Sequence, residues 1–245
     1  MAVTATLELV ALDATDIGAL ASFYAELTGW PAVRNVAGWI TLRASDGQEV
    51  GFQQVAEHRP PQWPGQERPQ QLHLDLLVDG HERAAQRAEA LGATRLADGV
   101  SWITLADPAG HPFDLCQRAG AGPQLQLFAT TIDAPDAPAL ARFYASLLGM
   151  APLEMAPTDD GPVGPLIVGG GKRLMFQQVS DYTPPQWPDP AHPQQGHLDI
   201  IVDDAGHLTA ASDRAQELGA TRLADGPTWI TLADPARHPF DLSVP

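Results

Sequence analysis

The chain is poor in cysteine, in basic side chains and in long apolar runs. Its single cysteine, Cys116, excludes an internal disulfide framework and fits a reducing compartment, so we expect a cytoplasmic protein. No apolar run approaches the roughly 20 residues that a membrane-spanning helix needs. The first residues carry neither a basic leader nor a cleavage-type apolar core. We therefore expect no membrane association and no secretion signal.

Basic residues are outnumbered, with 14 Lys and Arg against 30 Asp and Glu and a formal net charge of −16. Such a charge repels phosphate backbones, so we do not expect nucleic acid as a partner. It could attract a cationic ligand, or it could only keep the surface solvated. The expected partner is a small molecule.

The chain contains the same pattern twice. Residues 99–115 read GVSWITLADPAGHPFDL, and residues 226–242 read GPTWITLADPARHPFDL. Residues 12–30 match 132–150, and residues 52–64 match 176–188. The offset between the copies grows along the chain, which indicates short insertions in loops. We predict two similar domains, residues 1–119 and 125–245, with the flexible segment AGAGP between them.

Each repeat is expected to run strand, helix and further strands, twice over. After a strand-like opening, Asp16 is a plausible helix N-cap and Gly29 a C-cap. The apolar residues between them follow helical spacing. Residues 59–69 form a loop, because proline lacks the donor that a sheet needs. A second helix over 82–92 and a hairpin, with the turn at 107–110, complete the repeat.

Four such units, with ADP.GHPF.L endings and an H-L-D strand, resemble the vicinal oxygen chelate superfamily. This group includes glyoxalase I, bleomycin-resistance proteins and extradiol dioxygenases. The resemblance covers nearly the whole chain and is closest to tandem glyoxalase-like proteins. It implies an α+β fold of tandem glyoxalase-like domains, each built of two βαβββ units with a curled mixed sheet forming a cup. A cup could form within one domain or by exchange of units between domains, and the sequence fits both.

Side chains alternate along a strand, which separates the inner face of the cup from the core. His73 and Asp75 point away from the leucines of their strand, and a single-residue shift decides between Gln53 and Gln54 on another. The resemblance implies that metal ligands come from this inner face. The implied ligands are Gln53, His73 and Asp114 in the first repeat and Gln177, His197 and Asp241 in the second, with Gln178 as the alternative to Gln177.

The opening strands should supply a fourth ligand in this family, but Leu9 and Ala129 stand there. The remaining set suits Zn²⁺, Mn²⁺, Fe²⁺ or Ni²⁺ with modest affinity. It also suits no metal at all, because a one-sided sheet always has a polar face. Asp75 and Asp199 could act as general bases or could orient the histidines.

Other side chains have weaker functional signals. Trp63, Trp102, Trp187 and Trp229 are candidate walls for a flat substrate. Cys116 is expected to be a packed thiol. His111 and His238 are expected to be turn or surface residues.

The sequence favours a metal-dependent lyase or isomerase acting on a small oxygen-rich substrate. The alternative is a metal-free binding protein of the bleomycin-resistance kind that sequesters a cationic or aromatic natural product. A metal-free catalyst is a third reading, and extradiol dioxygenation is disfavoured because that pattern has two histidines and one glutamate per iron. We expect a pseudo-dimeric monomer or a homodimer.

Overall fold

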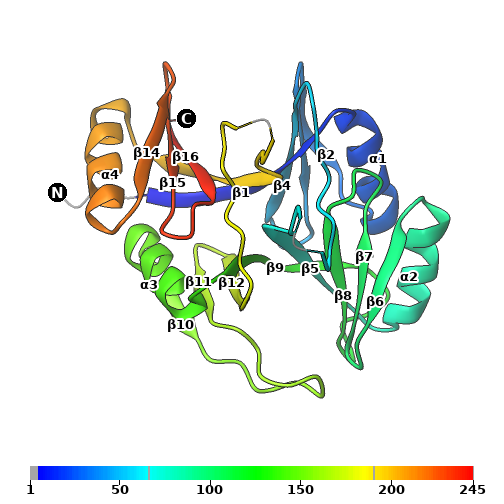
Figure 1. Ribbon diagram of the computed structural model, residues 1–245. Helices are drawn as coiled ribbons and strands as arrows, with labels where there is room; N and C mark the ends of the chain where they lie inside the picture. Colours follow the sequence, from blue (N-terminus) through cyan, green and yellow to red (C-terminus); the bar gives the residue numbers. More distant parts are fainter. Residues whose placement is uncertain (1–4, 66, 190, 245) are drawn as a thin grey trace.

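One succession of elements, strand-helix-strand-strand-strand, recurs four times along the chain (Figure 1). The structure is a computed structural model that describes residues 5–65, 67–189 and 191–244. The first unit contains β1 (Ala5–Ala14), α1 (Ile17–Thr28), β2 (Ala32–Val36), β3 (Trp39–Arg43) and β4 (Glu49–Gln54). The second contains β5 (Leu72–Val78), α2 (His81–Ala90), β6 (Thr94–Asp98), β7 (Trp102–Ala106) and β8 (Pro112–Gln117).

The second repeat supplies the other two units. The third unit contains β9 (Gln126–Ala134), α3 (Ala137–Leu148), β10 (Ala151–Leu153), β11 (Leu166–Gly169) and β12 (Lys172–Gln178). The fourth contains β13 (Gly196–Val202), α4 (Ala205–Glu217), β14 (Thr221–Asp225), β15 (Trp229–Ala233) and β16 (Pro239–Ser243). The α+β class and the four βαβββ units are therefore as predicted.

Local sequence sets the ends of α1. The Asp16 carboxylate accepts a hydrogen bond from the Ala19 backbone N–H at 2.9 Å, and this satisfies one of the free donors of the first turn. Gly29 ends the helix with φ of 79°, a left-handed conformation that favours glycine, and its N–H donates to the Ala25 carbonyl. Both predicted caps are confirmed.

The strand order of the two sheets shows whether a cup forms within one repeat or between the two repeats. One eight-stranded sheet has the order β14-β15-β16-β13-β1-β4-β3-β2, and the other has the order β10-β11-β12-β9-β5-β8-β7-β6. The first unit is thus joined to the fourth and the second to the third, through the antiparallel pairs β1–β13 and β5–β9. We call the two hollows the 1–4 cup and the 2–3 cup. Each cup takes one unit from each repeat.

The outer faces of the sheets pack within a repeat instead. Tyr24 of α1 stacks on Phe52 with ring centroids 5.6 Å apart and meets Phe113 edge-on at 6.0 Å. Its hydroxyl donates to Asp107 at 3.0 Å, and Tyr144 repeats these contacts in the second repeat. Each repeat therefore has its own aromatic core, although its inner faces serve two cups. The boundaries 1–119 and 125–245 stay a prediction.

Two glutamines hold the repeats together where β5 and β13 begin. The Gln71 N–H donates to the Gln195 side-chain oxygen at 3.0 Å, and the Gln195 N–H donates to the Gln71 side-chain oxygen at 2.9 Å. Both residues are buried. This exchange fixes the start of both strands that carry the candidate histidines.

His111 and His238 are turn residues, as expected, but they do not lie on the surface. Their exposed fractions are 2% and 4%. His111 contacts Asp107 through Nδ1 and the Gln195 carbonyl through Nε2 at 3.1 Å, so it connects the β7–β8 turn to the other repeat. The rings are buried at the turns because each histidine has a buried carboxylate partner four residues earlier, which satisfies the ring.

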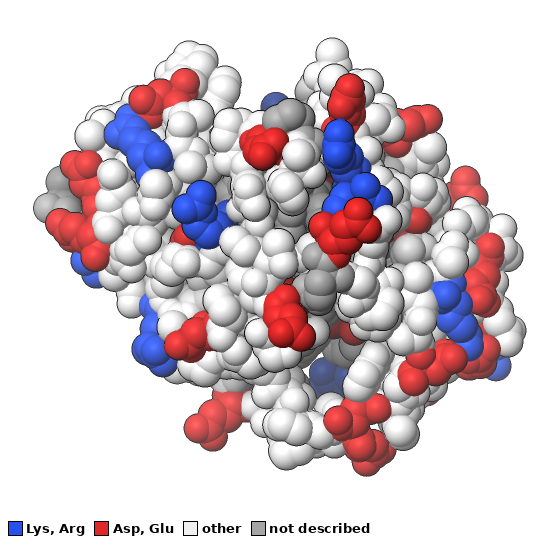
Figure 2. Space-filling view, viewed as in Figure 1, with Lys and Arg blue, Asp and Glu red and all other residues white. Residues whose placement is uncertain are grey.

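Residues 154–165, the strap, join β10 to β11 and run below the 2–3 sheet in Figure 1. The Asp160 carboxylate at the far end of the strap accepts from the N–H groups of Val100 and Ser101, each at 2.7 Å. Figure 2 shows a hollow above the strap and acidic side chains spread over the same face. No helix in the described part of the chain has the length and apolar character needed to cross a membrane.

Replacing Gln71 with Ala is expected to lower the free energy of unfolding by about 1–3 kcal/mol, because the buried Gln195 N–H loses its acceptor. Urea unfolding followed by circular dichroism measures the change. Gln86→Ala, at an exposed position of α2, is the matched control and should stay within about 0.5 kcal/mol of the original protein. Equal stability of the two variants would contradict the role given to this glutamine pair.

Candidate functional site

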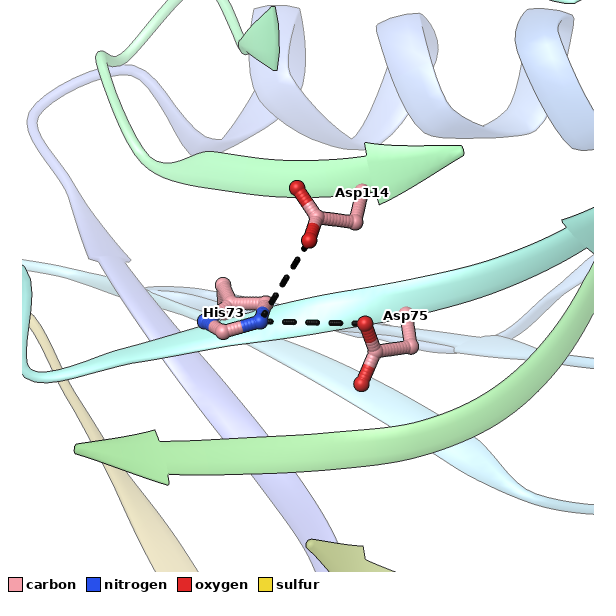
Figure 3. A group of neighbouring side chains, drawn as sticks. All are labelled: His73, Asp75 and Asp114. Carbon is pink, nitrogen blue, oxygen red and sulfur yellow. Dashed lines mark ion pairs between the residues drawn. The ribbon is translucent and has the colours of Figure 1, made fainter. Parts of the chain in front are cut away.

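The 2–3 cup brings together three polar side chains from two neighbouring strands. His73 and Asp75 lie two residues apart on β5, and Asp114 stands beside Asp75 on the parallel strand β8. His73 Nε2 lies 3.7 Å from Asp75 Oδ1 and 3.8 Å from Asp114 Oδ2. Figure 3 shows both carboxylates directed at the same imidazole nitrogen. His73 and Asp75 are buried, whereas the Asp114 side chain is 17% exposed.

The 1–4 cup repeats the arrangement. His197 Nε2 lies 3.5 Å from Asp199 Oδ1, and Asp241 stands beside Asp199 on the parallel strand β16. In each cup, one histidine nitrogen and two carboxylate oxygens all lie within 4.8 Å of one another. The histidines and aspartates that strand alternation placed on the inner face therefore lie on the inner face in the structure. This arrangement adds Asp75 and Asp199 to the groups that could hold a metal.

Sequence reasoning missed the other side of each histidine. The Gln70 amide nitrogen lies 3.2 Å from His73 Nδ1 and donates to Asp133 Oδ1 at 3.2 Å. Gln194 makes the same pair of contacts with His197 and Asp13. Asp13 lies four residues after Leu9 on β1, so strand alternation could have placed it on the inner face.

The two candidate glutamines lie opposite these aspartates. Gln53 pairs with Asp13 across β4 and β1, and Gln177 pairs with Asp133 across β12 and β9. The side-chain oxygen of Gln178 is already occupied, since it accepts from the Ala137 N–H at 3.0 Å. This favours the register chosen for the glutamines, but their part in metal binding stays a prediction.

The fourth ligand of the family pattern has no counterpart among the described opening strands. Leu9 pairs with Asp199, and Ala129 pairs with Asp75, so both stand beside the carboxylates as the sequence comparison indicated. Neither side chain offers a ligand atom. In the exchanged arrangement, Gln177 shares its cup with His73 and Asp114, and Gln53 shares its cup with His197 and Asp241.

Hydroxyl and thiol groups hold the carboxylates of the 2–3 cup. The Thr131 hydroxyl donates to Asp75, and the Cys116 sulfur lies 3.8 Å from the same carboxylate. The Thr104 hydroxyl donates to Asp114 at 2.6 Å. In the 1–4 cup, Thr231 does the same for Asp241 at 2.5 Å, but Ala11 stands beside His197 where Thr131 stands beside His73. Asp75 thus has a hydroxyl donor that Asp199 lacks at the corresponding position.

Burial and charge act on the protonation of both sites. Burial lowers the pKa of His197, but Asp199, Asp13 and Asp241 outweigh it and raise the pKa to about 9. The pKa of His73 is raised by its carboxylate neighbours in the same way, against the opposite effect of burial.

The carboxylates of the 2–3 cup also titrate abnormally. Burial raises the pKa of Asp75 to about 6, even though His73 favours its ionised form. Burial likewise raises the pKa of Asp133 to about 6 and holds the pKa of the Cys116 thiol well above its usual value. A buried group of acids around one imidazole is short of positive charge, which is the electrostatic setting of a cation site.

The tryptophans differ in their surroundings. Trp63 lines a pocket of about 270 Å³ together with Asp133 and Gln177. Trp102 stands opposite Cys116, on the same face as Thr104 and Asp114. Their use by a substrate stays a prediction.

In the second repeat, Trp187 is half-buried in a loop, and Trp229 on β15 is 39% exposed. Their role in substrate binding also stays a prediction. Sequence reasoning overlooked Trp39. Its ring centroid lies 6.4 Å from that of His197, inside the 1–4 cup.

Comparison with known protein families agrees with this fold. The model of the glyoxalase-like domain matches residues 9–116 and again residues 129–243, and the chain belongs to this family within the vicinal oxygen chelate superfamily. No curated protein matches the chain.

Solved structures agree at the level of the fold. Glyoxalase I from Zea mays is similar with a TM-score of 0.69 at 17% identity, over 99% of this chain and 93% of that one. A proposed dioxygenase from Bacillus subtilis is similar with a TM-score of 0.62 at 11% identity, over 98% and 84%. The CppA protein from Streptococcus pneumoniae reaches 0.50 at 13% identity over the full length of both chains.

The protonated form of His197 should stabilise the fold in a defined pH window. Its folded pKa of about 9 lies above the ordinary value of 6.5, so its contribution is complete below about pH 6.5 and is lost as the pH rises through 9. The free energy of unfolding should fall by up to about 3 kcal/mol across this window. Urea unfolding at intervals of pH measures the slope.

His197→Gln should flatten this slope, whereas His192→Gln, at an exposed loop position, should leave it unchanged. An unchanged slope in His197→Gln would show that this histidine is not protonated abnormally in the fold.

Proposed function

We propose that the protein is a metal-dependent lyase or isomerase of the glyoxalase-like kind that acts on a small oxygen-rich substrate. One observation carries the proposal. An imidazole nitrogen and two carboxylate oxygens converge in each cup, from His73, Asp75 and Asp114 and again from the corresponding residues of the 1–4 cup. Membership of the glyoxalase-like family supports the same reading.

The donor set fits a divalent ion. Ligands about 2.1 Å from one ion lie about 3.0–3.4 Å apart in octahedral or tetrahedral geometry. The observed separations of 3.7 and 3.8 Å around His73 exceed the tetrahedral value by only about 0.3–0.4 Å. One imidazole and two carboxylates suit Mn²⁺, Fe²⁺, Zn²⁺ or Ni²⁺. Gln177 could add an amide oxygen from the facing strand.

A bound ion would supply Lewis-acid polarisation of two substrate oxygens, which would stabilise negative charge that develops on the substrate. The chain itself would hold and move the proton. Asp133 is the candidate for this role, because its pKa of about 6 suits proton transfer near neutral pH and its carboxylate lies at the pocket. Asp75 and Asp199, expected to be bases, lie on the metal-facing nitrogen of each histidine, where they would serve as ligands first.

A metal-free binding protein of the bleomycin-resistance kind is the second candidate. The observation that favours it is the apolar pair Leu9 and Ala129 beside the carboxylates, which leaves each site without the opening-strand ligand. The same metal experiment separates the two candidates. Cytoplasmic location, lack of nucleic-acid binding and the choice between a pseudo-dimeric monomer and a homodimer stay predictions.

Protein purified without chelator or affinity tag should contain a transition metal, and chelator-treated protein should bind added Mn²⁺. Asp75→Asn combined with Asp199→Asn should weaken Mn²⁺ binding at least about 10-fold, because each site loses a charged ligand. Electron paramagnetic resonance of free Mn²⁺ measures the affinity. Ion saturation at 100 times the dissociation constant should also stabilise the fold by about 2.7 kcal/mol.

Asp46→Asn combined with Asp203→Asn is the matched control, since both carboxylates are exposed and lie outside the two cups. Its Mn²⁺ affinity should equal that of the original protein. Absence of any bound metal after purification, together with no Mn²⁺ binding, would falsify the metal-dependent proposal and favour the metal-free binding protein.

A further inference from the structure

A pocket of about 270 Å³ lies in the 2–3 cup, where Gln70 and Asp133 line it near the Nδ1 atom of His73. Gln70 connects the pocket to the histidine, since its amide contacts His73 Nδ1 and its side chain also lines the pocket. The lining includes three amides, one carboxylate and two aromatic rings, namely Gln70, Gln177, Gln178, Asp133, Trp63 and Tyr182. This volume suits a small molecule.

The lining of the pocket is selective for charge. Asp133 is the one ionisable acid that lines it, and no Lys, Arg or His is among the lining residues. Asp133 is buried and accepts a single hydrogen bond from Gln70 at 3.2 Å. An anion placed here would meet a buried carboxylate, whereas a cation or a hydrogen-bond donor would be attracted.

Tyr182 and Trp63 form the aromatic part of the pocket. Tyr182 donates its hydroxyl to the Ala236 carbonyl at 2.6 Å and lies 3.0 Å from His238 Nε2, so its ring is held in place. Trp63 belongs to a proline-rich loop that packs beside it in the same pocket. Two aromatic side chains favour a flat ligand, and their negative ring faces favour a cationic one.

The 1–4 cup has an indole ring beside its histidine and its glutamine. Trp39 of β3 pairs with Gln53, and a Cβ atom on Gly51 would lie 2.7 Å from the Trp39 ring. The indole N–H donates to the Thr41 hydroxyl at 2.9 Å, which fixes the ring beside His197. The indole can take this position because the residue beneath it is glycine.

The third unit has the opposite pair of residues. Met175 on β12 stands where Gly51 stands on β4, and Gly164 stands where Trp39 would be. Gln177 is consequently exposed, whereas Gln53 is half-buried. The two cups have equivalent histidines and carboxylates, but they differ in the side chains around the space that a ligand could enter.

We propose that the 2–3 cup binds a small planar ligand that is neutral or cationic and rich in hydrogen-bond donors, and that the 1–4 cup, which holds the Trp39 ring, does not bind it. Asp133, Gln177 and Trp63 are the residues that select this ligand. The inference deepens the proposed function and rests on it for the ligand's role as a substrate, but not for binding itself.

Three probes of equal size and planarity test the charge selectivity: benzamidine, benzamide and benzoate. Isothermal titration calorimetry and ligand-observed NMR on the full chain measure their binding. We expect benzamidine to bind at about millimolar affinity, benzamide more weakly and benzoate not at all. Benzoate binding as tight as benzamidine binding would overturn the proposal, and so would the absence of binding by both benzamidine and benzamide.

Matched variants locate the site. Asp133→Asn should weaken benzamidine binding about 10-fold and benzamide binding much less, because a charge-assisted hydrogen bond is lost. Asp13→Asn makes the same change in the 1–4 cup and should leave both affinities unchanged. Equal effects of the two variants would contradict the assignment to one cup.

Gln177→Ala and its counterpart Gln53→Ala keep the test independent of folding, because Gln177 is exposed and its removal leaves no buried group unpaired. Only Gln177→Ala should weaken benzamidine binding, by about threefold or more. Mn²⁺ affinity measured on Asp133→Asn, which removes no proposed metal ligand, separates this inference from the proposed function. Weaker benzamidine binding with unchanged Mn²⁺ affinity would support the pocket independently of the metal site. Unchanged benzamidine binding would contradict the role of Asp133 in the pocket, whatever the Mn²⁺ affinity.

Discussion

The antiparallel pairing of β5 with β9 and of β13 with β1 determines where the polar side chains of both cups point. These strand pairs are the only backbone ladders between the repeats among the described residues. Because side chains alternate along a strand, the pairing directs His73, Asp75 and Asp133 to one face and the leucines to the other. A shift of one residue in this register would bury the carboxylates among leucines and leave no site. The Gln71–Gln195 exchange stands at the start of these strands and opposes such a shift.

Electrostatic balance follows from the same pairing. Each histidine has aspartates on both sides, two near Nε2 and one reached through a glutamine amide near Nδ1. Burial makes this concentration of acid costly, and the raised pKa values of Asp75 and Asp133 express that cost. A protonated imidazole reduces the charge of the site in the absence of other cations. A positive charge near these buried carboxylates would therefore stabilise their ionised forms.

Much of the architecture could be predicted from the sequence, for identifiable reasons. The helix caps Asp16 and Gly29 have local signals, and the period of two in β5 separates His73 and Asp75 from the leucines. The exchange of units could not be predicted, because both repeats carry the same polar set and either pairing gives the same chemistry. The roles of Gln70 and His111 were missed because they depend on partners 63 and 84 residues away. Trp39 has no local signal either, since its place depends on the absence of a side chain at Gly51 on the neighbouring strand.

The covalent union of the two repeats has a consequence for how the cups can diverge. In a symmetric assembly of two identical chains, each substitution enters both cups together, so that an indole over one imidazole requires an indole over the other. A single continuous chain removes that symmetry. Trp39 with Gly51 on one side, and Gly164 with Met175 on the other, are differences that a two-fold axis would forbid. Fusion lets one hollow specialise while its twin keeps the shared framework intact.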